Sequence, residues 1–317
     1  KPIIGCEVYI LAKEHRSNRD HNVPYHHLVL LAKNEEGYLN LAQINTIAHT
    51  EGFYYKPRID KETLRAHSGG LIALAACLQG EVNVHLQERH LDEAEKVARE
   101  YMDIFGPDNF YLEMQDHGIP EQKVVNEGVR ELCQRTGLKA VITNDVHYLH
   151  QSHAEAHEVM LCIQTSTTMS DPKRMRYASN EFYFKSREEL EKRFPNDAGA
   201  FDLTQEIADR CNVTLSFSNG KAESLHFPTF EVPEGFTDGL SYLVHLGKEG
   251  LRRHYGFDYD RPENEEQKKL IERFDYEVGI IQKTGFINYF LVVSDFVKWS
   301  RHNGVPVGPG RGSGAGS

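Results

Sequence analysis

The strongest constraint on the fold is an alternation of short apolar runs with amphipathic segments over residues 1–163. Five strand-like runs are visible, at 2–11 (PIIGCEVYIL), 27–32 (HLVLLA), 71–78 (LIALAACL), 110–114 (FYLEM) and 140–143 (AVIT). Between or after them lie helix-like segments at 35–51, 91–105, 120–137 and 153–163, with helical spacing of apolar residues or with Pro at the start and Gly past the end. This alternation predicts an α/β fold in which helices cover a parallel sheet.

The remainder of the chain has a different pattern. Residues 165–235 are less regular and rich in turn-forming residues, which places a domain change near 212–224. Three helices are expected after it, at 237–255, 263–284 and 288–302, followed by a short strand at 305–307 and a glycine-rich end. The aromatic and basic stretch 53–58 (FYYKPR) is interpreted as a packed connection, although such a mixture could also stack on bases.

Charge and cysteine content exclude several classes of protein. The formal net charge is −11, so the total charge does not attract the chain to phosphates as it would a generally basic nucleic-acid binder. No run of about 18 apolar residues is present, so we expect no membrane span. The five cysteines are scattered, odd in number and without a C-x-x-C pair, which fits a reducing cytoplasm better than a disulfide framework or a zinc finger.

Metal-capable residues recur in or just after the strand-like runs, where α/β barrels gather their functional side chains. Thirteen of the 17 histidines precede position 158. Taken singly, each candidate has an ordinary structural explanation: a salt-bridged carboxylate, a hydrogen-bonded histidine, a small buried thiol or an Asx turn. Taken together, they indicate a divalent-metal cluster. The candidates are Glu7, the pair His26-His27, Cys77, Glu113, Asp145 and His147. His153 and His157, one helical turn apart, are interpreted as packing or surface residues.

The glycine-rich end, 308–317 (GPGRGSGAGS), can turn sharply and bring backbone N–H groups against an anion. Arg311 and Ser313 add donors suited to phosphate oxygens. The segment matches neither G-x-G-x-x-G nor a Walker loop, so spacing alone leaves two interpretations open, a phosphate site or a flexible tail.

Several motifs in order resemble the C-family of bacterial replicative DNA polymerases. The most specific is 304–317 (GVPVGPGRGSGAGS), which is similar to the glycine–serine motif at the start of that family's palm. Supporting matches are KPIIGCEVYI, HHLVLLAKNEEGYLNL, EGFYYKPRID, LIALAACLQGE, EMQDHGIPEQ, ITNDVHYL and FINYFLVVSDFVKW. The resemblance runs over the whole chain.

The resemblance implies a polymerase-and-histidinol-phosphatase (PHP) domain over residues 1–215, folded as a distorted β/α barrel. A mainly helical segment, 216–317, would then lead into a nucleotidyltransferase-type palm. By position, the family's metal ligands fall on Glu7, His27, Cys77, Asp145 and His147, with Zn²⁺ or Mn²⁺ as the expected ion. Further family ligands, including a His-x-His motif, would lie upstream of Lys1, and the catalytic aspartates beyond the last residue. The chain is therefore expected to be a fragment that does not polymerise by itself.

The resemblance also implies an activity for the parent enzyme, namely template-directed DNA synthesis by Mg²⁺-dependent nucleotidyl transfer from deoxynucleoside triphosphates. Expected partners are primer–template DNA, the sliding clamp, the clamp loader and a proofreading exonuclease subunit, all in the cytoplasm and none in a membrane. The nucleotide would be held by the glycine-rich end, at Gly310, Arg311, Gly312, Ser313 and Gly314.

The role of the PHP site itself stays open at this point. It could be a 3′–5′ exonuclease or phosphoesterase. It could instead be a non-catalytic scaffold that docks the proofreading subunit. A free-standing PHP phosphoesterase would need no nucleotide-binding tail, so residues 308–317 argue against that alternative.

Overall fold

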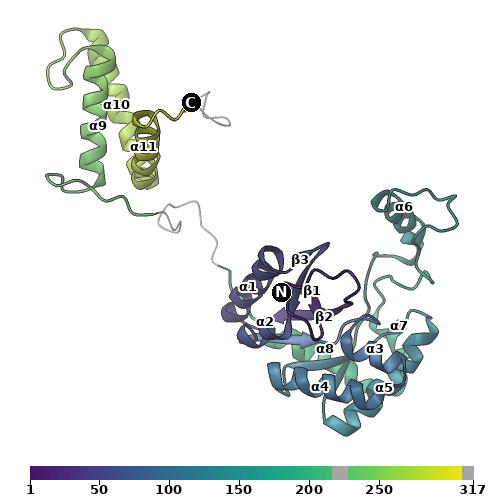
Figure 1. Cartoon of the computed structure of the whole chain (residues 1–317). Coiled ribbons are helices and arrows are strands. Elements are labelled where there is room, and N and C mark those ends of the chain that lie inside the picture. Colours follow the sequence, from purple (N-terminus) through teal and green to yellow (C-terminus); the bar gives the residue numbers. More distant parts are fainter. Residues whose placement is uncertain (216–227, 309–317) are drawn as a thin grey trace. The chain divides into compact units, whose positions relative to one another are not determined.

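A computed structural model describes residues 1–215 and 228–308 (Figure 1). The chain divides into two compact units, Lys1–Leu215 and Ser216–Ser317. The first unit is a mixed α/β structure and the described part of the second is helical, which confirms the predicted fold class of an α/β domain followed by a helical segment.

The first unit is built on a seven-stranded sheet with the order β3-β4-β1-β2-β5-β6-β7. The strands are β1 (Gly5–Leu11), β2 (Tyr25–Ala32), β3 (Phe53–Tyr54), β4 (Lys56–Asp60), β5 (Leu71–Leu74), β6 (Phe110–Met114) and β7 (Lys139–Ile142). β5, β6 and β7 are parallel, as expected, but β2 is antiparallel to both β1 and β5. The expectation of a parallel sheet is wrong for this strand, because β1 and β2 are joined without the crossover helix that a parallel pair requires.

Helices surround this sheet. They are α1 (Glu35–Thr50), α2 (Lys61–Ala66), α3 (Glu81–Gln87), α4 (Leu91–Phe105), α5 (Pro120–Thr136), a 3₁₀ turn η1 (Gln151–His153), α6 (Ala154–Gln164), α7 (Arg187–Arg193) and α8 (Ala198–Arg210). The four longer predicted helices are confirmed. Those at α2, α3, α7 and α8 were not predicted, nor was the small β3–β4 hairpin within 53–58. α6 lies on a segment that projects from the body of this unit (Figure 1).

Side chains alternate between the two faces of the sheet, as a two-residue period requires. In β6, Phe110, Leu112 and Met114 point into a large core that includes residues of α1, α4 and α5. Tyr111 points the other way, into a smaller cluster with residues of α8. Glu113 has the same parity as Tyr111, so its carboxyl group lies on the α8 side of the sheet.

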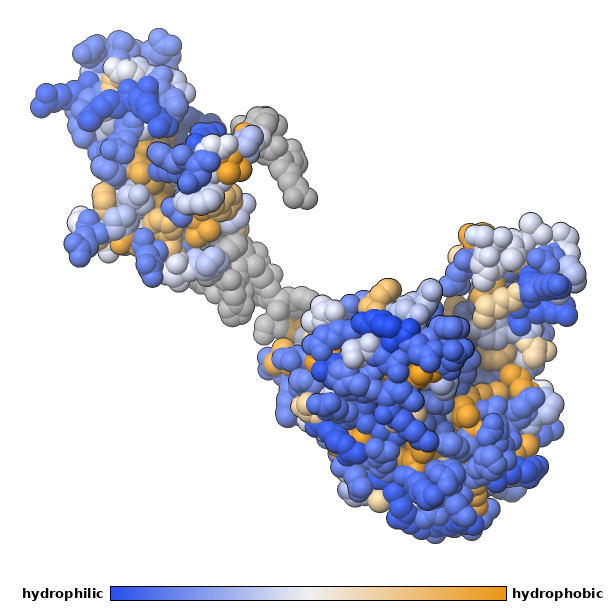
Figure 2. All heavy atoms as spheres, viewed as in Figure 1, coloured by the Kyte–Doolittle hydropathy of each residue, from blue (hydrophilic) through white to orange (hydrophobic). Residues whose placement is uncertain are grey.

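The described part of the second unit contains α9 (Gly239–Tyr255), α10 (Glu265–Thr284) and α11 (Ile287–His302), which confirms the three predicted helices. Asp238 caps α9 by accepting a hydrogen bond from the backbone N–H of Ser241, and Gly256 ends it with a φ of 73°. Residues 305–307 form no strand, so that prediction is wrong. Within the described residues, no helix is long and apolar enough to cross a membrane. Figure 2 shows how hydrophilic and hydrophobic residues are distributed over one face of the molecule.

We predict that Gly80→Ala destabilises the first unit. A Cβ at Gly80 would lie 1.9 Å from the carbonyl oxygen of Ala75, so the loop after β5 would have to move, at a cost of about 1–3 kcal/mol. Gly199→Ala is the matched control, because its Cβ meets nothing within 4 Å and helix α8 favours Ala over Gly. Urea unfolding should give a lower midpoint for Gly80→Ala only. Equal midpoints for the two variants would contradict the prediction.

Candidate metal centre

Glu7 and His27 are brought together by the pairing of β1 with β2. The register places Glu7 opposite Val29 and His27 opposite Tyr9, so Glu7 and His27 are diagonal neighbours on one face. That face is opposite the large core, and it is the face on which Glu113 lies. The Oε1 atom of Glu7 is 2.8 Å from the Nδ1 atom of His27, a hydrogen-bonding distance.

Cys77 joins this pair from the loop that follows β5. Its Sγ atom lies 3.6 Å from the same Nδ1 atom of His27. The side-chain amide of Asn83, in α3, holds the loop by donating to the carbonyl oxygens of Ala76 and Cys77, each at 3.0 Å. The carboxylate of Glu7 and the thiol of Cys77 therefore both contact the imidazole of His27, which brings three of the five candidate ligands together.

These contacts change the charge of the imidazole. Hydrogen bonds with Cys77 and then Glu7 raise the pKa of His27 to about 9, against the opposing effect of burial. The hydrogen bond from His27 lowers the pKa of Glu7. With no ion bound, His27 is therefore protonated and Glu7 ionised at neutral pH. A metal ion that used His27 as a ligand would have to displace a proton.

Asp145 and His147 follow β7 on a neighbouring loop. Asp145 has a φ of 39°, and its carbonyl oxygen lies 2.9 Å from the Nδ1 atom of His147. A carbonyl oxygen can only accept, so Nδ1 carries a proton and Nε2 is the ring nitrogen that could bind a metal. The backbone N–H of His147 donates to the carbonyl oxygen of Phe182 at 2.9 Å, which fixes the loop.

Among the described residues, no hydrogen bond or ion pair joins Asp145 or His147 to Glu7, His27 or Cys77. Electrostatic effects nevertheless relate the two loops. The pKa of Glu7 is lowered mainly by the hydrogen bond with His27 and to a smaller extent by the charge of His147. Burial raises the pKa of Tyr177, and the charges of Asp145, Cys77 and Glu7 raise it further. The pKa of Tyr177 is therefore affected by charged groups on both loops.

Glu113 connects the strand ends from which these loops start. It is 4% exposed, and its carboxylate accepts hydrogen bonds from the backbone N–H of Ala76 and from the hydroxyl of Thr143, the latter at 2.7 Å. Ala76 precedes Cys77, and Thr143 lies two residues before Asp145. Burial raises the pKa of Glu113 to about 7, although the two hydrogen bonds oppose the shift. The strand position of Glu113 was noticed in the sequence, but the resemblance assigned it no role.

The residue before Asp145 gives an independent indication of a missing polar partner. Both side-chain polar atoms of Asn144 are buried without a hydrogen-bond partner, which is costly for an amide. The buried ring of His117 fixes the backbone of Asn144, since its Nε2 atom donates a hydrogen bond to the carbonyl oxygen of Asn144 at 2.8 Å. An ion or its hydration water near Asp145 would satisfy the Asn144 side chain.

The donor set fits a divalent metal. Two carboxylates, two imidazoles and a thiol combine hard and borderline-soft ligands, as zinc or manganese can use. The ligand atoms of these five side chains are not already arranged around a single point. In the metal-free protein, Glu7 and His27 form an ion pair with each other instead.

A different trio lies closer together. Ligand atoms of His15, Asp60 and Glu62 are within 4.8 Å of one another. Among the described residues, no other group of three or more His, Cys, Asp or Glu side chains has its ligand atoms this close together. The guanidinium of Arg16 lies 3.2 Å from Asp60 Oδ2, and the hydroxyl of Thr63 donates to Asp60 Oδ1. The guanidinium of Arg16 therefore already compensates the charge of Asp60, and we assign no metal to His15, Asp60 and Glu62.

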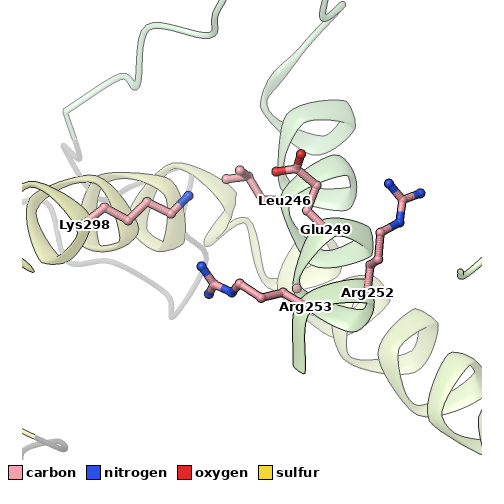
Figure 3. A pocket seen from close by; sticks show the side chains of 6 residues that line it. Leu246, Glu249, Arg252, Arg253 and Lys298 are labelled. Atoms are coloured by element: carbon pink, nitrogen blue, oxygen red, sulfur yellow. The ribbon is translucent and has the colours of Figure 1, made fainter. Parts of the chain in front are cut away.

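The predicted nucleotide-binding residues Gly310, Arg311, Gly312, Ser313 and Gly314 lie outside the described residues. The second unit does contain a cavity of about 350 Å³ between α9 and α11 (Figure 3). Across it, the side chains of Arg253 and Lys298 point toward one another. Nearby charges are paired, Arg252 with Asp258 at 2.8 Å and Glu249 with His245 at 3.6 Å.

Sequence reasoning did not find the aromatic cluster around His147. The ring of His147 lies 4.8 Å from that of Tyr177 and 5.8 Å from that of His157, measured between centroids. Phe182 contacts the rings of both His147 and Tyr177. These residues come from an irregular segment and from α6, so no periodic signal linked them. The sequence signals in this region were the accumulation of histidines before position 158, the helical pair His153 and His157, and His147 itself.

Comparisons with known proteins agree with the motifs. Residues 1–117 match the PHP domain family, and residues 241–317 match the bacterial DNA polymerase III alpha NTPase domain. The whole chain aligns with proteins named DNA polymerase III subunit alpha. It is 41% identical to that of Treponema pallidum, of which it covers 26%. It is 42% identical to that of Helicobacter pylori J99, with 27% covered, and 38% identical to that of Thermus aquaticus, with 30% covered. The predicted resemblance is therefore confirmed, and the chain spans about a quarter of the length of these relatives. PHP domains and DNA polymerases are in general metal-dependent.

We predict that Glu113→Leu destabilises the first unit by about 1–3 kcal/mol, because the buried N–H of Ala76 loses its acceptor. Glu113→Gln keeps an acceptor for Ala76 and can donate to Thr143, so it should cost less. The pKa of Glu113 is raised from 4.5 to about 7. The wild type should therefore lose stability as pH rises from 4.5 through 7, and the glutamine variant should not share that loss. Urea unfolding at pH 5 and pH 8 measures both effects. Equal losses for Leu and Gln would contradict them.

We also predict a pH-dependent role for His27 in the metal-free protein. Its pKa is raised from 6.5 to about 9 in the folded state. The stabilisation is complete below pH 6.5 and is lost as pH rises through 9, an effect on the order of 1–3 kcal/mol. In EDTA, the stability difference between wild type and His27→Gln should be largest at pH 6 and smallest at pH 10. A difference that is constant with pH would show that His27 is not protonated by this contact.

Proposed function

We propose that this chain, similar over its whole length to DNA polymerase III alpha subunits, is part of the catalytic subunit of a bacterial replicative DNA polymerase. The observation that carries the proposal is the order of the two domain matches within one continuous alignment at 41% identity. The reaction of the whole enzyme is template-directed DNA synthesis by nucleotidyl transfer, with Mg²⁺ as the expected ion. Residues 1–215 are assigned to the PHP domain and 216–317 to the start of the palm.

In the first unit, we assign metal binding to Glu7, His27, Cys77, Asp145 and His147, with Zn²⁺ or Mn²⁺ as the ion. An ion held there would supply Lewis-acid stabilisation of phosphate charge. The chain's own residues prepare the site in two ways. Glu7 takes the proton-bearing Nδ1 of His27 as a partner until a metal replaces that proton. The Asp145 carbonyl fixes the ring of His147 with Nε2 free. The reaction that this arrangement supports is 3′–5′ exonuclease or phosphoesterase hydrolysis.

In the second unit, Arg311, Gly312 and Ser313, with Gly310 and Gly314, are proposed to hold the triphosphate of the incoming nucleotide by charge and backbone donors. Arg253 and Lys298 give the cavity in Figure 3 a pair of cations that suits a phosphate of primer–template DNA. The further partners are the sliding clamp, the clamp loader and the proofreading exonuclease subunit. The compartment proposed is the cytoplasm, with which five free cysteines agree.

Two alternatives differ in what the first unit does. As a scaffold, it would dock the proofreading subunit without catalysis. The exposed side chains of Val159, Met160 and Ile163 on α6 favour this alternative, because they give a partner an apolar surface. A free-standing phosphoesterase is disfavoured by the match of residues 241–317 to a polymerase domain.

We predict that the full-length protein binds zinc, manganese or iron and digests labelled single-stranded DNA from its 3′ end. Asp145→Asn should lower the digestion rate at least 100-fold, because it removes a ligand charge. Asp202→Asn is the matched control, since this exposed carboxylate only pairs with Arg187 on the surface. Metal content is measured by mass spectrometry and digestion by gel electrophoresis.

The outcomes separate the alternatives. Bound metal with digestion that depends on Asp145 supports a working nuclease. Bound metal without digestion supports the scaffold. If no metal binds, the assignment of the five ligands is wrong.

A further inference from the structure

A second cavity lies in the first unit, between α6 and residues that include Tyr148 and Tyr177. Its volume is about 240 Å³. Its walls include three rings and three polar side chains: Tyr148, His157, Tyr177, Glu155, Glu158 and Asn180. The volume is smaller than that of a pocket for a drug-sized ligand, so the cavity suits one ring system.

Two of the residues that line the cavity contact a candidate metal ligand. Tyr177 and His157 both line the cavity, and both contact the ring of His147 at centroid distances of 4.8 and 5.8 Å. His157 also contacts the ring of Tyr148, at 5.3 Å. A molecule with its phosphate at His147 could therefore place an attached ring between these side chains.

The charged side chains that line the cavity favour the base of a nucleotide over its phosphate. Glu158 is paired with Arg174 at 3.1 Å. Glu155 is exposed, and no ion pair is found for it among the described residues. A free carboxylate repels a phosphate but accepts hydrogen bonds from an amino group on a base. The three rings offer flat apolar surfaces on which a base can stack. The side-chain amide of Asn180, also unpaired within the described part of the chain, adds a donor and an acceptor.

We propose that this cavity binds the nucleobase of a nucleotide whose phosphate lies at the metal centre, and that it prefers a base with an exocyclic amino group. The inference rests on the proposed phosphoesterase function and adds a substrate class to it. Tyr177 and His157 are assigned as stacking residues and Glu155 as the residue that reads the amino group.

The test uses calorimetric binding to the Mn²⁺-loaded full-length protein. The probes are dCMP, dTMP and inorganic phosphate. The wild type should bind dCMP at least tenfold more tightly than phosphate, and more tightly than dTMP. His157→Ala should weaken dCMP binding at least fivefold relative to phosphate, because a stacking surface is lost. His153→Ala is the matched control, since His153 precedes α6 and does not line the cavity.

A second variant keeps the inference falsifiable if His157→Ala disturbs the fold. Glu155→Gln changes an exposed side chain and should remove the preference for dCMP over dTMP while phosphate binding is unchanged. Equal binding of dCMP and phosphate by the wild type, with metal present, would overturn the base-binding cavity and leave the metal centre intact. Absence of both metal and phosphate binding would overturn the proposed function and this inference together.

Discussion

The buried carboxylate of Glu113 is the contact on which the candidate site depends. It lies in the middle of three parallel strands and accepts one hydrogen bond from each neighbouring strand end, from the N–H of Ala76 and from the hydroxyl of Thr143. Cys77 is the next residue after Ala76, and Asp145 is the second residue after Thr143. A carboxylate is expensive to bury, and the two hydrogen bonds offset part of that cost while they hold two ligand-bearing loops in position.

The backbone around these loops is held in conformations that side chains other than glycine adopt rarely. Ala76 has a φ of 63° and Asp145 a φ of 39°. Each is surrounded by contacts that fix it: Asn83 binds the carbonyl of Ala76, and His117 binds the carbonyl of Asn144. Such strain persists only where the surroundings determine it, and it is found at functional sites. Two of the five non-glycine residues with positive φ among the described residues, Ala76 and Asp145, lie just beyond the ends of β5 and β7.

Much of this arrangement could be predicted from the sequence, and the reasons for the rest are physical. Apolar runs and helical spacing located β6 and α4 at their observed bounds, because period and capping are local properties. The antiparallel direction of β2 depends on how the chain returns to the sheet, which no local pattern specifies. The strand expected at 305–307 does not form, because no strand among the described residues pairs with this Val-Pro-Val run and Pro cannot donate to a ladder.

The candidate ligands show the same division. Residue type and strand position were enough to single out Glu7, Cys77 and Asp145. The contact between Glu7 and His27 required the strand register. The roles of Tyr177 and His157 required the folding of an irregular segment against His147, and those of Asn144 and Glu113 required their burial to be known. Local sequence thus indicates which residues are capable of the chemistry, and tertiary structure decides which of them meet.

Cobalt substitution tests the central claim, that Glu7, His27, Cys77, Asp145 and His147 share a metal, most directly. Co²⁺ bound to the full-length protein should show a thiolate-to-cobalt charge-transfer absorption, because Cys77 is the one sulfur in the set. The band should disappear in Cys77→Ser and persist in Cys133→Ser, whose thiol lies in α5 and packs against the large core. A cobalt spectrum without a thiolate band, or one unchanged in Cys77→Ser, would contradict the account.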